Sequence, residues 1–282
     1  MCAGVLFIVI NDAIAKWLID RYDPYQIIFG RSLLALPLIT CLILARDGAA
    51  ALKSARLRVH ALRGLFAMGA IYTFYYGLSV MSLAEATSLI FAAPLFITAL
   101  SATLLGDKVG WRSWSAVIAG FIGVLVIIQP GTATFQPASL YIIAAAAFYA
   151  LVMISARWID GRDNLRTMMF YMSLFPLVFS SFVLFTDWPV PTRLDAVLFA
   201  GMAVFGTLGV TLISQAFRMA PAAVVAPFDY TALIWATFLG WLLWGSVPGP
   251  LTYAGAAVII VSGGYLIVRP DRQARPAEVA GE

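Results

Sequence analysis

Long apolar stretches alternate with short polar breaks along almost the whole chain. A helix that spans a bilayer needs roughly 20 apolar residues, because each residue adds about 1.5 Å to its length. Charged residues, prolines and glycines divide the chain into ten stretches of about this size. We therefore predict ten spanning helices, near residues 2–19, 24–45, 61–80, 83–105, 110–128, 138–157, 165–186, 194–216, 221–244 and 250–268. The first stretch runs on into this pattern, so we interpret it as a spanning helix rather than a cleaved signal.

The composition points to the same class of protein. Hydrophobic residues make up 62% of the 282 residues, and charged residues only 11%. A soluble domain averages roughly 45–50% apolar and about 25% charged residues. The chain is therefore predicted to be an all-α integral membrane protein, with connections too short to hold a separate soluble domain. Residues 269–282 are polar and are predicted to form a cytoplasmic tail.

Two stretches about 140 residues apart follow one template. Residues 81–123 and 219–263 each contain a small-residue helix start, an apolar run, a glycine-containing break and a second apolar run. This similarity divides the ten helices into two repeats of five, residues 1–130 and 138–268. An odd number of helices places the second repeat in the membrane upside down, so the repeats are related by inversion. Inverted repeats are typical of transporters whose central site opens alternately to each side.

Basic residues predict the orientation of the chain. Of the 18 Lys and Arg residues, fourteen fall in breaks or at span ends on one side of the membrane, and only Arg21 and Arg193 fall on the other. Because basic loops remain in the cytoplasm, we predict a multi-pass protein of the bacterial inner membrane with both termini cytoplasmic. The net charge of +4 comes from these flanking residues, so it does not indicate a nucleic-acid partner.

Five ionisable residues lie inside the predicted spans: Asp12, Lys16, Arg31, Glu85 and Asp229. Such groups are costly in hydrocarbon unless they meet a partner or face a cavity. Asp12 and Lys16 are four residues apart and share a helix face, so Asp12 is predicted to orient Lys16, in a mutual ion pair or toward a cavity. Arg31 stays charged at any ordinary pH. It is predicted either to be held by Asp12 or backbone carbonyls, or to bind an anionic group of a substrate.

Asp229 follows Pro227 in the ninth predicted span. Proline removes a helical hydrogen bond and bends the helix, and a carboxylic acid beside such a bend is a candidate site for a proton or a cation. The alternative is a pairing of Asp229 with Arg31 or Lys16 across the bundle. The candidate proton or charge-compensation residues are Asp229, Asp12 and Glu85. Glu85 is near the end of its span and can reach water.

Polar and aromatic side chains complete the candidate site. Tyrosines at membrane interfaces commonly serve as anchors, which is one interpretation of Tyr72, Tyr76 and Tyr230. The other interpretation is that their rings stack on a planar group of the substrate. Gln26 adds an amide inside the second span. The predicted substrate-binding residues are Arg31, Lys16, Tyr72, Tyr76, Tyr230 and Gln26.

Catalytic motifs are missing from the sequence. There is no Gly-rich phosphate loop, HExxH, CxxC or GxSxG, and the two Cys and single His are too few for a disulfide framework or a metal site. We therefore expect no enzyme activity, no cofactor and no metal.

The chain resembles the EamA-type members of the drug/metabolite transporter superfamily in the order and spacing of several segments. These segments are NDAIAKWL, QIIFGRSLLALP, LAEATSLIFAAPLFITALSATLLGDKVG, QAFRMAPAAVVAPFDY and GAAVIIVSGGYLIVRP. The resemblance covers about residues 5–268 and implies two EamA repeats, transport by alternating access through a central cavity, and no ATP-binding domain. The residues Asp12, Lys16, Gln26 and Arg31 resemble the branch that carries S-adenosylmethionine, riboflavin and organic anions.

These observations together predict a secondary transporter of a small organic metabolite that carries a carboxylate. Arg31 and Lys16 would hold that carboxylate, and coupling to a proton or an ion would drive transport. One alternative is a cationic or zwitterionic metabolite such as S-adenosylmethionine, or riboflavin, with Asp229 and Glu85 as counter-charges. Another is a membrane sensor or enzyme without net flux. The expected partners are the small-molecule substrate and the lipid bilayer.

Overall fold

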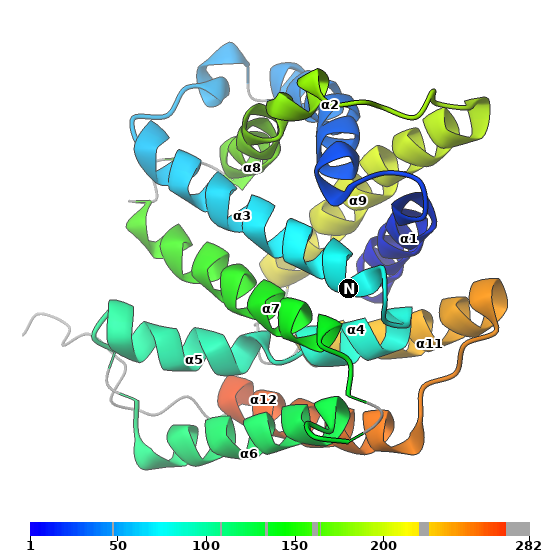
Figure 1. Ribbon diagram of the computed structural model, residues 1–282. Coiled ribbons are helices and arrows are strands. Elements are labelled where there is room, and N and C mark those ends of the chain that lie inside the picture. The colour runs from blue at the N-terminus through cyan, green and yellow to red at the C-terminus, as the bar shows by residue number, and fades with distance from the viewer. Residues whose placement is uncertain are drawn as a thin grey trace, which may run out of the picture.

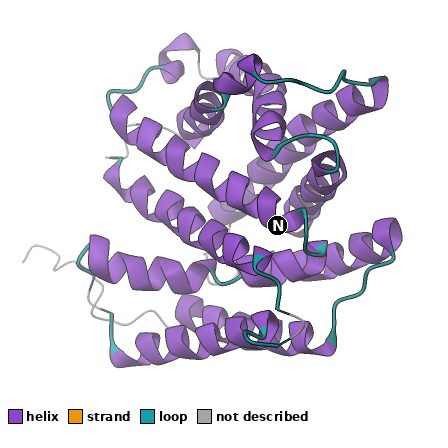
Figure 2. Ribbon diagram, viewed as in Figure 1, coloured by secondary structure: helices purple, strands orange, loops and turns teal. Residues whose placement is uncertain are grey.

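The computed structural model describes residues 1–46, 48–107, 109–132, 135–159, 163, 165–219 and 226–268. Within these ranges every regular element is a helix (Figures 1 and 2). The first half contains α1 (Cys2–Ile19), α2 (Pro24–Arg46), α3 (Leu57–Leu78), α4 (Leu83–Ile90), α5 (Ala93–Leu104) and α6 (Trp111–Ile128). The second half contains α7 (Ala138–Ser155), α8 (Leu165–Phe179), α9 (Arg193–Met219), α11 (Thr231–Trp244) and α12 (Pro250–Val268). Short 3-10 turns are η1 (Ala49–Leu52), η2 (Ala156–Trp158), η3 (Ser181–Phe185) and η4 (Ala226–Tyr230).

The fold confirms the predicted all-α membrane architecture of ten helices in two inverted halves. Among the described residues, seven helices are long and apolar enough to cross a membrane, and Pro250–Leu266 is a shorter apolar helix. Of the other two predicted spans, α3 has its charged residues in its first two turns. The ninth span consists of η4 and α11, and its first five predicted residues, 221–225, lie outside the described part of the chain.

Two predicted spans differ in detail from the structure. The span predicted at 61–80 begins four residues earlier, because the first turn of α3 extends into the basic segment. The span predicted as one helix over 83–105 is broken into α4 and α5 at Phe91 and Ala92. Pro94 stands in the first turn of α5, where its missing N–H costs no hydrogen bond. The ninth span changes at an equivalent place from the 3-10 turn η4 to α11.

Contacts between the halves follow the symmetry of an inverted repeat. The third helix of one half packs along the first helix of the other, so that α3 lies on α7 and α9 lies on α1 (Figure 1). Helices at equivalent positions also meet: α2 packs on α8, α4 on α11 and α6 on α12. The helices therefore exchange neighbours between the halves instead of forming two separate bundles. The main apolar cluster accordingly takes residues from both halves.

The fifth helices of the two halves approach each other closely. A Cβ atom built on Gly123 of α6 would lie 2.8 Å from the Gly255 carbonyl oxygen of α12, and one built on Gly255 would lie 2.6 Å from the Gly123 carbonyl oxygen. Small residues at such a crossing let two backbones meet without side chains between them. The pair α6 and α12 therefore depends on glycine at both positions.

We expect Gly255→Ala to destabilise the protein by about 1–3 kcal/mol, the usual cost of overpacking. The new Cβ atom would lie 2.5 Å from Ile127 Cγ1, so α6 and α12 would have to separate. Thermal unfolding in detergent micelles measures the change. Gly264→Ala in the same helix is the matched control, because nothing lies within 4 Å of its new Cβ atom. An equal loss in both variants would contradict the close crossing.

Candidate functional site

Lys16 caps the C-terminal end of α3. Its Nζ donates to the carbonyl oxygens of Leu78 at 2.8 Å and Met81 at 2.7 Å. The last carbonyls of a helix have no partner within the helix and carry its negative dipole end, so an ammonium group suits them. The ion pair with Asp12 that the spacing allowed is not formed, because Lys16 reaches these carbonyls instead. Lys16 therefore fixes α1 to the turn between α3 and α4.

A polar cluster joins α1, α2 and α3 at the level of Arg31. Arg31 Nη1 donates to the Tyr75 hydroxyl at 3.2 Å, and Asn11 Nδ2 donates to Asp12 Oδ1 at 3.0 Å. Arg31 and Asp12 attract each other electrostatically without a direct ion pair. Tyr75 and Asn11 are fully enclosed, with 1% and 3% of their surface exposed. Of the predicted partners of Arg31, the structure thus brings Asp12 close and adds Tyr75, which the sequence did not indicate.

Asp229 lies in η4, in the second half, and is not paired with Arg31 or Lys16. Its side chain is exposed in the structure and makes no hydrogen bond or ion pair with the described residues. Asp229 interacts electrostatically with two tyrosines: Tyr149 of α7, and Tyr230, which follows Asp229 in the chain. The predicted cross-bundle pairing is therefore wrong, because Lys16 and Arg31 donate to other oxygens and no cation of the described residues pairs with Asp229. Its role as a proton site stays a prediction.

Tyr230 lies where the broken fourth helices of the two halves meet. Its ring stands edge-on to Phe91 at the α4–α5 break, with the ring centres 5.1 Å apart. Its hydroxyl is buried without a partner among the described residues, and a Cβ atom on Gly263 would lie 2.6 Å from it. Gly263 therefore leaves room for the Tyr230 hydroxyl beside α12.

Tyr72 and Tyr76 lie one turn apart on α3, and their ring contacts are with residues other than Tyr230 and Phe91. Tyr72 stacks on Tyr25 with ring centres 4.2 Å apart, and Tyr76 meets Tyr141 at 4.3 Å. Tyr76 is 41% exposed on the molecule. The two rings belong to an aromatic cluster of α2, α3 and α7. Ring stacking on a substrate stays a prediction for them.

Gln26 and Glu85 both have local structural partners. Gln26 Nε2 donates to the carbonyl oxygen of Asp187 at 3.0 Å, which ties α2 to the connection before α9. Glu85 Oε2 accepts from the backbone N–H of Ser82 at 3.1 Å, while Glu85 N–H donates to Ser82 Oγ. This reciprocal capping box satisfies the first turn of α4 and places a negative charge at the positive end of the helix.

An apolar cavity of about 230 Å³ lies between α1, α9 and α11. Its lining consists of Ile10, Ala13, Ile14, Trp17, Leu198, Leu239 and Leu243. None of the predicted polar site residues borders it. It is suited to a lipid tail or another apolar group, so it does not add to the polar site.

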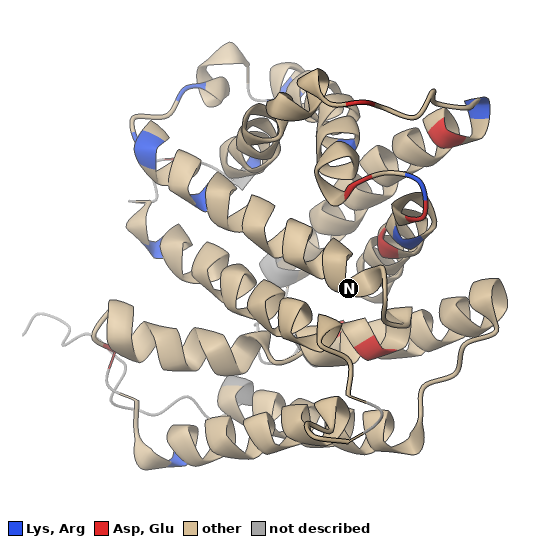
Figure 3. Ribbon diagram, viewed as in Figure 1, with Lys and Arg blue, Asp and Glu red and all other residues tan. Residues whose placement is uncertain are grey.

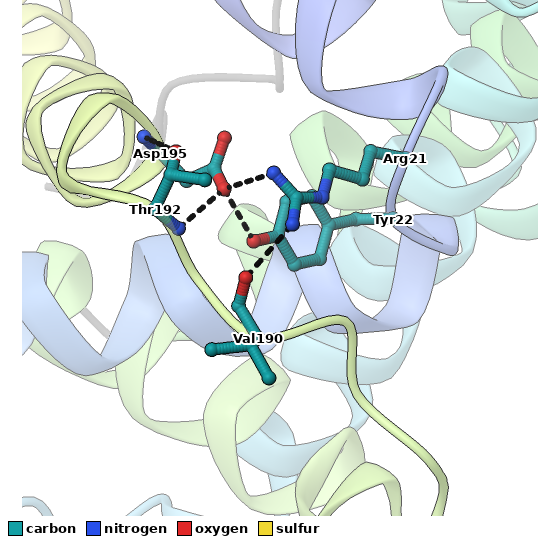
Figure 4. Close-up of polar contacts among 5 residues, drawn as sticks. All are labelled: Arg21, Tyr22, Val190, Thr192 and Asp195. Atoms are coloured by element: carbon teal, nitrogen blue, oxygen red, sulfur yellow. Dashed lines mark hydrogen bonds and ion pairs between the residues drawn. The ribbon is translucent and has the colours of Figure 1, made fainter.

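At one end of the bundle a single carboxylate ties the two halves together (Figure 4). Asp195 Oδ2, in the first turn of α9, accepts hydrogen bonds from Arg21 Nη1, the Tyr22 hydroxyl and the Thr192 N–H at 2.8–2.9 Å. Arg21 Nη2 also donates to the Val190 carbonyl oxygen at 2.8 Å. Burial and the bond to Asp195 raise the pKa of Tyr22 above its usual value. We call the group Arg21, Tyr22, Thr192 and Asp195 the Arg21 clamp.

A second clamp stands at the opposite end of the bundle. His60 Nε2 lies 2.8 Å from Asp163 Oδ2, and Ser54 Oγ donates to the same oxygen. Although burial acts against it, the hydrogen bonds from Ser54 and His60 lower the pKa of Asp163 below its usual value. The His60 ring is 1% exposed and stacks on Tyr171 of α8, with ring centres 4.5 Å apart. We call Ser54, His60 and Asp163 the His60 clamp.

The two clamps occupy equivalent places in the inverted repeat. The Arg21 clamp joins the connection after the first helix of one half to the start of the third helix of the other. The His60 clamp does the same with the halves exchanged, because Asp163 follows α7 and His60 begins α3. A further ion pair, Arg157 to Asp107 at 2.6 Å, links the halves at the His60 end. In Figure 3 the coloured charges accordingly gather toward the helix ends.

Sequence reasoning did not find either clamp. Arg21 entered only the charge count, and His60 was placed in a solvated basic segment. The inverted repeat itself could have indicated them. It places the first polar connection of each half beside the third helix of the other half.

Inverted halves that exchange neighbours are typical of membrane transporters. The chain belongs to the EamA-like transporter family, whose model matches residues 1–129 and 136–269. This finding confirms the resemblance seen in the sequence.

Several relatives share most of their length with the chain. It is 29% identical to an S-adenosylmethionine uptake transporter of Rickettsia prowazekii, over 92% of this chain and 87% of the relative. It is 30% identical to a riboflavin transporter of Vibrio cholerae, over 77% and 73% of the two chains. It is 27% identical to a pseudopaline exporter of Pseudomonas aeruginosa, over 92% and 91%. A solved structure with 17% identity and a TM-score of 0.58, covering 94% and 95% of the two chains, shares the fold.

The Arg21 clamp predicts a measurable coupling between Arg21 and Asp195. We expect Arg21→Gln and Asp195→Asn each to lower the unfolding temperature in micelles, and the double variant to lose less than the sum. The coupling should be about 0.5–1.5 kcal/mol, because the pair is charge-assisted but partly exposed. Arg193→Gln, at an arginine in the same region, is the control for a general charge effect. A strictly additive double variant would contradict the clamp.

The lowered pKa of Asp163 predicts a pH-dependent stability. The ionised carboxylate is favoured in the folded protein, so its contribution is complete above about pH 4 and is lost as the pH falls through the lower folded-state pKa. We expect Asp163→Asn to lower the unfolding temperature at pH 7, with a difference from wild type that shrinks toward pH 3. Asp187→Asn, at an exposed carboxylate, should show no such change. A difference that is constant with pH would contradict the assignment.

Proposed function

We propose that this protein is a secondary transporter that moves a small organic metabolite, bearing a carboxylate, across the bacterial inner membrane by alternating access. The observation that supports this most directly is the pair of equivalent clamps at opposite ends of the bundle. Each clamp closes one end between the two halves. A carrier needs two such closures, of which at least one is formed at any moment, so that no continuous channel opens.

Inverted halves make the two open states similar in structure. Opening the Arg21 clamp separates the α1–α2 connection from the start of α9, and opening the His60 clamp performs the equivalent movement at the other end. Because the same kinds of helix contact are exchanged, the two states can have comparable free energies. The ligand then shifts the population between them through the contacts it makes in each state.

The candidate binding region lies between the two clamps. Arg31 supplies a cation that is held by Tyr75 and attracted by Asp12, and we assign it to the anionic group of the substrate. Lys16, bonded to two carbonyl oxygens, would act by holding α1 in place. Asp229 is exposed and makes no hydrogen bond or ion pair with the described residues, so it is the proposed site of proton binding or charge compensation.

The second candidate substrate is a cationic or zwitterionic metabolite. It is favoured by the relative that takes up S-adenosylmethionine, which shares 29% identity with this chain. In this case the uncompensated carboxylate of Asp229 would face the positive group, and Arg31 would bind the amino acid carboxylate. Riboflavin, the substrate named for another relative, would instead depend on ring stacking.

The proposed orientation rests on the distribution of basic residues. Fourteen Lys and Arg residues on the His60 side against two on the Arg21 side support an orientation with the His60 clamp and both termini in the cytoplasm. The Arg21 clamp then closes the periplasmic end.

Transport into proteoliposomes tests the proposal. We expect the protein to carry at least one of three labelled probes, a small dicarboxylate, S-adenosylmethionine or riboflavin. Arg31→Gln should reduce carboxylate transport about tenfold or more, since a hydrogen bond to a charged group is worth about 1.5–3 kcal/mol. Arg112→Gln, at an exposed arginine of α6, is the matched control.

Three outcomes separate the candidates. Carboxylate transport that survives Arg31→Gln and Lys16→Gln unchanged would exclude the assigned anion site. Competition by S-adenosylmethionine alone, abolished by Asp229→Asn, would favour the zwitterionic substrate. Binding of a probe to purified protein without any flux into vesicles would favour a sensor.

A further inference from the structure

Arg63 is the buried cation that the other residues leave without a partner. It lies in the second turn of α3, with 4% of its surface exposed. Its Nε and Nη1 atoms have no hydrogen-bond partner among the described residues, and no described carboxylate is close enough to attract it. Lys16 and Arg31, by contrast, both donate to oxygens of neighbouring helices.

An unpartnered buried guanidinium is unusual because arginine cannot shed its proton to escape the cost of burial. Buried charges in proteins are normally paired, and an unpaired one strongly destabilises the fold. A buried charge of this kind is therefore a candidate functional site. The free donors of Arg63 have the planar, forked geometry that binds a carboxylate or a phosphate through two hydrogen bonds.

The helix positions Arg63 toward the interior of the bundle. Spacings of four, seven and eleven residues place Arg63 on the same face of α3 as Ala67, Ala70 and Phe74. Phe74 packs against the main apolar cluster, to which both halves contribute. Tyr76, which is 41% exposed, lies on another face. Arg63 therefore projects from α3 toward the region between the halves.

The His60 clamp stands directly before Arg63 along the helix. His60 is three residues earlier in α3, and Arg63 lies about 9 Å from the helix start at 1.5 Å per residue. His60 contacts Asp163, so this carboxylate lies against the start of α3 while the clamp is closed. Opening the His60 clamp would expose Arg63 to the solution on that side.

We propose that Arg63 is an anion-binding residue of the transport pathway, which takes the carboxylate or phosphate group of the substrate when the His60 end opens. This inference rests on the proposed transport function and deepens it, because it names a second cation and the ligand chemistry that it selects. Arg31 and Arg63 then form two anion-binding positions on one route, Arg31 two turns into α2 from the Arg21 end and Arg63 two turns into α3 from the His60 end. The ligand group is an oxyanion with at least two acceptor oxygens.

Anion-dependent stability of the purified protein tests the inference. The probes are malonate and inorganic phosphate, added to lipid-depleted protein in maltoside micelles at constant ionic strength. We expect either probe to raise the unfolding temperature of the wild type by about 2–5 °C at saturation, by binding only the folded state. Arg63→Gln should abolish the shift, and Arg63→Lys should weaken the apparent affinity about tenfold. Arg112→Gln should retain the wild-type response.

The stability of the unliganded variants gives a second readout. Without added anion, Arg63→Gln should unfold at a higher temperature than the wild type, because a buried unpaired charge has been removed. A lower unfolding temperature together with no anion response in the wild type would overturn the inference and assign Arg63 a structural partner. A full anion response in Arg63→Gln would overturn it as well. Arg63→Lys keeps the test valid if Arg63→Gln fails to fold.

Two further arms identify the source of the anion and separate this inference from the proposed function. In nanodiscs, Arg63-dependent stabilisation by phosphatidylglycerol over phosphatidylcholine would assign the site to a lipid headgroup and overturn the substrate role. A rise in the unfolding temperature with malonate that persists in both lipids supports the substrate role. Flux into proteoliposomes without any anion-dependent rise in the unfolding temperature would overturn this inference and leave the proposed transport function intact. An Arg63-dependent shift without flux of any probe would contradict transport alone.

Discussion

A charged group inside a bilayer must find its partner within the protein, because the lipid tails supply none. In the first half, the charges inside the predicted spans meet this demand and thereby fix helices. Lys16 closes the end of α3, Arg31 donates to Tyr75, and Glu85 caps α4. These bonds set α1, α2, α3 and α4 relative to one another more specifically than apolar contacts could. Packing along lipid-facing surfaces has no hydrophobic driving force, so directional bonds and close glycine contacts decide the arrangement.

Because of the inverted repeat, equivalent sets of polar contacts lie at the two ends of the bundle. Equivalent connections bind equivalent helix starts in both clamps, but with different groups: a guanidinium, a phenol and a carboxylate at one end, an imidazole, a hydroxyl and a carboxylate at the other. Between the clamps, the broken fourth helices meet at Phe91 and Tyr230. Both breaks interrupt regular helical hydrogen bonding at the level where a central ligand would bind. Backbone irregularity of this kind occurs in transporters where it borders the binding site.

The sequence alone predicted the helices well, because apolar length and polar breaks are properties of the chain itself. The spans at 2–19, 24–45 and 110–128 agree with α1, α2 and α6 to within a residue. The break between α4 and α5 was missed, since one proline in an apolar run does not reveal whether a helix starts or bends there. Side-chain partners were harder to predict. Asp12 and Lys16 share a helix face, yet Lys16 bonds to carbonyls of α3 that only the tertiary fold brings near. His60 and Asp163 are 103 residues apart, and no local pattern joins them.

In the proposed alternating access each clamp would break in every cycle, and a weak clamp suits that demand. The Arg21 side chain is 42% exposed, and exposed ion pairs contribute about 0–1 kcal/mol, a cost that thermal motion and ligand binding can meet. The His60 clamp is buried, and breaking it leaves His60 and Asp163 to be hydrated. In the proposed cycle, Arg63 offsets the cost of hydrating His60 and Asp163. Opening the His60 end brings water or an anion to Arg63 Nε and Nη1, which have no partner among the described residues while that end is closed. A closed end that contains an unpaired charge is less stable than its contacts suggest. The free energy gained by Arg63 on opening would then be available to admit an anionic ligand at that end. Near the Arg21 end, Lys16 and Arg31 both donate to oxygens of neighbouring segments, so the two ends differ in how their cations are partnered.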